Sequence, residues 1–188
     1  MEDLKEIVLK AASEMSKKLV ELDYILQTSE EAKAFLTYFL IKKLGEKRLY
    51  MLYLNRVPSL GLKEDRKKYP DIVLFGKDNA VFIKVKLLPR GLKARHARER
   101  IWGRKRRSGE ERVYGIPDHA RKFKKISQLI PKKTLVYFVI FDEKNYLNKE
   151  NLVELEKKVK DVDPNFRILH YNLRRLRELK QRGLLTSL

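Results

Sequence analysis

The sequence predicts an α/β domain in which helices flank a mixed central β-sheet. Residues 3–26 repeat apolar side chains with a helical period, whereas 71–88 hold two apolar runs separated by the turn sequence GKDN. The run TLVYFVIF (134–141) is the most apolar in the chain and is typical of a fully buried strand. At 188 residues the chain is long enough for one domain with a sizeable core, which we expect to span 1–188.

The first half predicts an N-terminal helix (1–27), followed by a core over 28–141 that opens with a second helix at 29–44. Thr28 is the expected N-cap of that second helix, since Glu31 follows at the spacing of a capping box. The aromatic-rich segment 48–57 ends before Pro58 and predicts a strand. The runs at 71–75 and 80–88 predict two further strands.

The second half predicts a basic insertion and a C-terminal extension. The insertion, 89–122, is rich in Lys, Arg and Gly, and we expect a helix at 93–102, a mobile loop, and a helix at 118–129. The extension, 142–188, predicts an αβα unit: a helix capped by Asn148, a strand at 166–172 and a basic amphipathic helix at 173–185.

Charge narrows the function classes. The chain has 44 basic and 25 acidic residues, a formal charge of +19, which favours a polyanionic partner; a merely soluble basic protein is the alternative. No run predicts a membrane helix or a signal peptide, and there is no cysteine. We therefore expect a cytoplasmic protein without a membrane partner, from a prokaryotic, archaeal or viral context. Abundant Lys, Arg and Glu also fit a thermophile.

One motif points to a family. Pro70-Asp71 opens the strand at 71–75, while Lys84 and Lys86 share one face of the next strand, because side chains alternate along a strand. With the order helix, three strands, helix, strand over 29–141, this resembles the PD-(D/E)XK nuclease superfamily, which includes archaeal Holliday junction resolvases. The resemblance implies a restriction-endonuclease-like core that holds Mg²⁺ or Mn²⁺ between carboxylates and hydrolyses phosphodiester bonds in duplex or branched DNA.

The resemblance also implies roles for individual residues. Asp71 matches the first metal ligand, and Lys86 matches the lysine that positions the attacking water and stabilises developing charge. Lys84 departs from the family pattern because it stands where the second acid should be. Its ammonium would repel Mg²⁺ and could pair with Asp71 instead.

Two other acids are candidates to replace the missing ligand. In a subset of the superfamily the second acid lies on the following helix, and Glu99 has a similar spacing. The resemblance also matches Glu31 to the acid that many members supply from the preceding helix, so the candidate metal ligands are Asp71, Glu99 and Glu31. The alternatives are that Glu31 only completes a capping box and that Glu99 is a surface charge paired with Arg95 or Arg98.

The insertion predicts a phosphate-binding surface. Arginines in RERIWGRKRRSGEERVYG (98–115) suit bidentate phosphate contacts, and Trp102 or Tyr114 could stack on a base. A basic loop with no defined partner is the alternative. The predicted nucleic-acid contacts are Arg95, Arg98, Arg100, Trp102, Arg104, Lys105, Arg106, Arg107, Arg112, Arg121, Lys122, Lys124 and Lys125.

Two functions follow as hypotheses. The first is a Mg²⁺-dependent DNA endonuclease acting in repair or recombination, with Asp71, Lys84, Lys86 and Glu99 at its catalytic site. The second is a degenerate nuclease-fold module that binds DNA, or less readily RNA, without cutting it. The resemblance further suggests a homodimer formed through the N-terminal helix.

Overall fold

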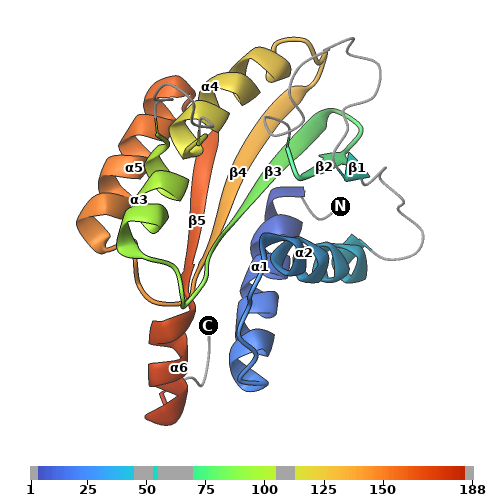
Figure 1. Cartoon of the computed structure of the whole chain (residues 1–188). Helices are drawn as coiled ribbons and strands as arrows, with labels where there is room; N and C mark the ends of the chain where they lie inside the picture. Colours follow the sequence, from blue (N-terminus) through green and yellow to red (C-terminus); the bar gives the residue numbers. More distant parts are fainter. Residues whose placement is uncertain (1–3, 45–52, 55–69, 105–112, 185–188) are drawn as a thin grey trace.

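The computed structural model describes residues 4–44, 53–54, 70–104 and 113–184. These residues form a five-stranded sheet with helices on both faces (Figure 1). The described elements, in chain order, are α1 (Leu4–Glu21), α2 (Ser29–Leu44), β1 (Tyr53–Leu54), β2 (Ile72–Phe75), β3 (Asn79–Leu88), α3 (Ala94–Trp102), α4 (Ile116–Ser127), β4 (Lys133–Asp142), α5 (Lys149–Val162), β5 (Phe166–Asn172) and α6 (Leu173–Gln181).

The sheet is mixed, as predicted. Its strand order is β1-β2-β3-β4-β5; β2 is antiparallel to both β1 and β3, whereas β3, β4 and β5 are parallel. Figure 1 shows α3, α4 and α5 on one face of the sheet and α1 and α2 on the other. The predicted α/β class with a mixed sheet flanked by helices is therefore confirmed.

Successive side chains of β3 point to opposite faces of the sheet and belong to two separate core layers. Val81, Ile83 and Val85 pack with α1 and α2, whereas Ala80 and Phe82 pack with α3, α4 and α5. Because side chains two residues apart share a face, Lys84 and Lys86 lie on the face covered by α3 and α4. The two lysines therefore interrupt an otherwise apolar layer.

Several helix ends differ from the prediction. α1 ends at Glu21 instead of 27, because Asp23 adopts a positive φ of 49° and the Tyr24 N–H bonds back to the Leu19 carbonyl at 2.9 Å. This is a Schellman ending without the usual glycine. α4 spans Ile116–Ser127 instead of 118–129, and α6 ends at Gln181 instead of 185. The predicted strand at 48–57 lies outside the described residues except for Tyr53–Leu54.

A buried ion pair joins the C-terminal helix to the rest of the domain. Arg177 of α6 donates to Glu143, just after β4, at 2.6 Å, and to the Tyr24 carbonyl at 2.7 Å. Glu143 also accepts the Leu26 N–H at 3.0 Å. These contacts hold α6 against the segment that leaves α1. Within the described ranges, no helix has both the length and the apolar character needed to span a bilayer.

Candidate functional site

Asp71 lies at the centre of a buried ionic cluster. The pairing of Ile72 with Ile83 places Asp71 directly across from Lys84 on the neighbouring strand. Asp71 is only 3% exposed, and its Oδ1 lies 3.0 Å from the Lys84 Nζ and 3.4 Å from the Lys33 Nζ of α2. Its Oδ2 accepts the Val85 N–H at 2.8 Å. Both carboxylate oxygens therefore have protein partners.

This arrangement does not fit a divalent metal ion. Mg²⁺ and Mn²⁺ require several oxygen ligands and little positive charge nearby. Here two ammonium groups approach the same carboxylate oxygen, and the described part of the chain contains no group of three His, Asp or Glu side chains placed to hold a metal. Lys84 and Lys33 thus take up a carboxylate oxygen that a metal ion would need.

The two candidate replacement ligands have other partners. Glu31 accepts the Gln27 and Thr28 N–H groups at 2.7 and 3.1 Å, and these hydrogen bonds lower its pKa. The Thr28 hydroxyl in turn accepts the Glu31 N–H at 3.1 Å, which completes the predicted capping box. Glu99, on α3, lies 3.1 Å from the Arg95 Nε and 3.5 Å from the Arg104 Nη1.

Lys86 lies beside the cluster, in an electropositive setting. Its Nζ donates to the Tyr114 carbonyl, at the start of the segment leading to α4, at 3.3 Å. Burial lowers the pKa of Lys86 to about 8, and the charges of Lys84, Arg100 and Lys33 add to this effect, while Asp71 opposes it. Burial also lowers the pKa of His119 on α4 to about 2, so that this imidazole is neutral at physiological pH.

A large cleft opens between α3, α4 and α5 on the same face of the sheet. Its volume is about 1270 Å³. Five cationic side chains and two acids line it, together with Trp102. The five cations are Arg95, Arg98, Arg104, Arg121 and Lys158.

The structure brings together only some of the predicted nucleic-acid contacts. Trp102 and four of the predicted arginines line the cleft, but Arg100 donates to the Leu87 carbonyl at 3.1 Å, and Lys124 pairs with Asp163. Lys122 and Lys125, on α4, do not line it. Lys105, Arg106, Arg107 and Arg112 lie outside the described residues. Sequence reasoning missed Lys33 and Lys158, because both approach their sites from elements distant in the chain.

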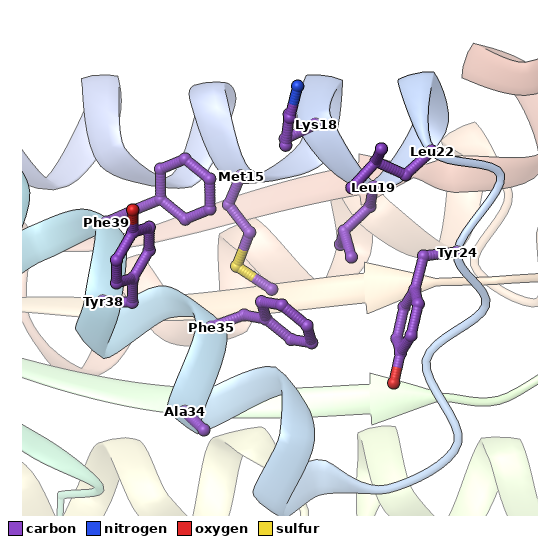
Figure 2. Close-up of a pocket in the computed structure, with 9 residues that line it drawn as sticks. All are labelled: Met15, Lys18, Leu19, Leu22, Tyr24, Ala34, Phe35, Tyr38 and Phe39. Atoms are coloured by element: carbon purple, nitrogen blue, oxygen red, sulfur yellow. The ribbon is translucent and has the colours of Figure 1, made fainter.

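An apolar groove lies on the opposite side of the molecule, between α1 and α2. Figure 2 shows Met15 and Leu19 of α1 facing Phe35 and Phe39 of α2 across it. Its volume is about 480 Å³. Tyr38, which also lines the groove, is 60% exposed, and Ile41, one turn along α2, is 55% exposed. This face of the helical layer thus presents large apolar side chains to solvent.

No family model, curated protein or solved structure matches the chain. The resemblance to the PD-(D/E)XK superfamily therefore rests on the order of the elements and on the residues around Asp71.

Proposed function

We propose that this protein binds nucleic acid, with DNA as its partner, and holds it on a nuclease-like core without hydrolysing it. The observation that carries the proposal is the buried cluster in which Lys84 and Lys33 share an oxygen of Asp71. A carboxylate neutralised by two lysines is a poor ligand for a catalytic cation. The basic α3–α4–α5 cleft supports a binding role, because phosphate contacts by Lys and Arg supply most of the affinity for nucleic acids.

A cleavage assay tests the non-catalytic part of the proposal. Linear, flapped and four-way DNA would be incubated with Mg²⁺ or Mn²⁺ and the wild type, Asp71→Ala or Lys84→Glu. We expect no cutting by the wild type. Cutting by the wild type would overturn the proposal, and its loss in an Asp71→Ala protein that circular dichroism shows to be folded would establish the endonuclease hypothesis. Cutting gained only in Lys84→Glu would show that one substitution separates this site from a working one.

A binding assay tests the nucleic-acid part. Fluorescence anisotropy with labelled duplex DNA would be measured over a salt series. If the five cations of the cleft contact phosphates, the logarithm of affinity should fall against the logarithm of salt with a slope of about −4 to −5. The absence of binding to DNA and RNA at low salt would refute the proposed function.

A matched pair of variants locates the binding surface. Reversing three cleft charges (Arg95→Glu, Arg98→Glu and Arg121→Glu together) should abolish most of the affinity. Reversing three exposed charges elsewhere (Lys42→Glu, Arg174→Glu and Arg182→Glu together) changes the net charge equally and should cost much less. If both triple variants lost the same affinity for DNA, the protein would be a basic protein with no defined binding face.

The α1–α2 groove supports a proposal about the partner of that face, namely a second copy of this chain. Residues 1–44 contain seven basic and eight acidic side chains, whereas 45–188 contain 37 and 17. Two copies therefore repel each other least when their α1–α2 layers meet. Pairing there would cover Tyr38 and Ile41 and leave both basic clefts accessible to DNA.

A further inference from the structure

We propose that the α3–α4–α5 cleft holds an unpaired segment of the bound nucleic acid, with one base stacked on Trp102 and the adjoining phosphates on the surrounding arginines. This inference rests on the proposed nucleic-acid-binding function and specifies which structure of nucleic acid the cleft accepts.

The size of the cleft favours a segment of chain over a small molecule. At about 1270 Å³ it exceeds the roughly 300–1,000 Å³ of typical small-ligand pockets. Three helices form its walls, so that a strand lying in it would be contacted from α3, α4 and α5. A segment of several nucleotides would therefore fill this volume more completely than a compact metabolite would.

The charges in the cleft suit phosphodiesters. Its two acids already have cationic partners: Glu99 pairs with Arg95 and Arg104, and Glu154 lies 2.7 Å from the Lys158 Nζ. Five cations against two acids leave the cleft with a positive excess. Arg95 and Arg121 have exposed side chains, so that their guanidinium groups can turn from their present carboxylate partners to a phosphate.

Trp102 supplies a platform for a base. It is the last residue of α3 and packs partly against the core, which fixes the indole. The Lys158 Nζ lies 4.5 Å from the ring centroid, so that the face of the indole toward α5 is occupied by a cation from an exposed side chain. Because that side chain is solvated and flexible, a base can displace it, and the ammonium can then contact a phosphate.

The stacking geometry selects unpaired bases. Inside a duplex both faces of a base are covered by its neighbours, so that an indole can stack only on a base that is unpaired, has left the helix or lies at an open end. A fully paired duplex would contact the arginines at the rim of the cleft and leave the indole as it is. The cleft therefore distinguishes single-stranded from paired nucleic acid through one side chain.

Intrinsic fluorescence tests this directly, because Trp102 is the only tryptophan in the chain. We expect a short oligothymidylate to quench Trp102 emission on saturation, whereas a relaxed closed-circular duplex, which has no ends, binds without comparable quenching. Oligouridylate is titrated in parallel to include RNA. If neither single strand quenches the wild type although anisotropy shows that it binds, the inference is wrong and the proposed function stands. If no probe binds, the proposed function fails.

Substitutions supply the second test. Trp102→Ala should weaken oligothymidylate binding roughly five- to one-hundred-fold and duplex binding less than about two-fold, while Trp102→Phe retains most single-strand affinity. Leu129→Ala, an exposed apolar change on the surface, is the control. Circular dichroism and thermal melting would show whether Trp102→Ala is misfolded. If it is, the inference is tested by the fluorescence quenching of the wild type alone. Equal loss for single strand and duplex in a folded Trp102→Ala would overturn the inference.

Discussion

At the scale of single residues, Asp71 connects two strands and a helix through its carboxylate. A buried ion pair contributes little net stability, but removal of one partner leaves an uncompensated charge. Asp71→Ala would leave Lys84 and Lys33 close together without their shared acceptor. We expect a loss of about 3–5 kcal/mol in the free energy of unfolding, measured by urea denaturation.

A second substitution separates this charge effect from simple loss of packing. Lys84→Met in the Asp71→Ala background removes one of the two stranded charges and should restore a substantial part of the stability. Asp78→Ala changes an exposed carboxylate in the β2–β3 turn and serves as the control, with an expected effect within about 0.5 kcal/mol. If Asp71→Ala cost no more than Asp78→Ala, the cluster would not be a buried network.

Lys86 predicts a pH dependence of stability. Its pKa of about 8 in the folded protein lies below its ordinary value of 10.5, so that between these pH values the unfolded chain binds more protons. The free energy of unfolding should therefore rise with pH between about 8 and 10.5. Below about pH 8 the buried lysine is charged in the folded protein, and its full destabilising effect is present. Lys86→Met should remove that rise and stabilise the protein by roughly 1–3 kcal/mol near neutral pH.

Urea denaturation at a series of pH values measures this difference. Lys93→Met, which changes an exposed lysine, should reproduce the wild-type dependence. A rise that persists unchanged in Lys86→Met would show that another group titrates.

At the scale of elements, Gly103 at the end of α3 and Gly115 at the start of α4 come into contact beside the cleft. A Cβ on Gly115 would lie 2.2 Å from the Gly103 nitrogen and 2.2 Å from the Trp102 carbonyl carbon, both of them backbone atoms that cannot yield locally. Gly115→Ala must therefore push the end of α3 away from the start of α4. We expect a loss of about 1–3 kcal/mol and a shift in the Trp102 emission maximum.

Gly91→Ala is a matched control, because a Cβ at Gly91 would meet nothing within 4 Å. It should leave both the unfolding free energy and the emission maximum near the wild-type values. An unchanged emission maximum in Gly115→Ala would indicate that the indole is not held by this junction.

The elements also show where sequence reasoning succeeds and where it stops. The caps at Thr28 and Asn148 were predictable because each side chain bonds to a backbone N–H three residues away. The end of α1 was not, since the apolar pattern continues past Asp23, which takes a conformation typical of glycine. Local signals thus fixed the element types more reliably than their ends.

The contacts of the candidate site were likewise predicted only in part. Pairing of Lys84 with Asp71 was foreseeable from their positions on adjacent strands. Lys33 contacts Asp71, and Lys158 contacts the indole of Trp102, from segments far apart in the chain. Such long-range contacts produce no periodic pattern in the sequence and were not predicted. The ion pair of Arg177 was not predicted either. The sequence of its basic helix is typical of a solvated helix, and only the fold places Glu143 beside Arg177.

At the scale of the whole molecule, the near-neutral α1–α2 segment and the helices α3, α4 and α5 that line the basic cleft lie on opposite faces of the sheet (Figure 1). A polyanion bound in the cleft would therefore lie on the side away from the apolar groove. Nucleic-acid binding and self-association would then use separate surfaces and could occur together.

Self-association through the α1–α2 face is the prediction at this scale. Tyr38 and Ile41 are exposed on α2, so that Tyr38→Glu with Ile41→Glu would bring four carboxylates together in a symmetric pair and should convert a dimer to a monomer. Sedimentation velocity over a range of protein concentrations measures the change.

Val153→Glu, at an equally exposed position on α5, should leave the dimer intact. The doubly substituted monomer should still bind DNA in the cleft, since neither position lines it. A wild type that is monomeric at every concentration would refute self-association, and a dimer that the double substitution leaves intact would place the interface elsewhere.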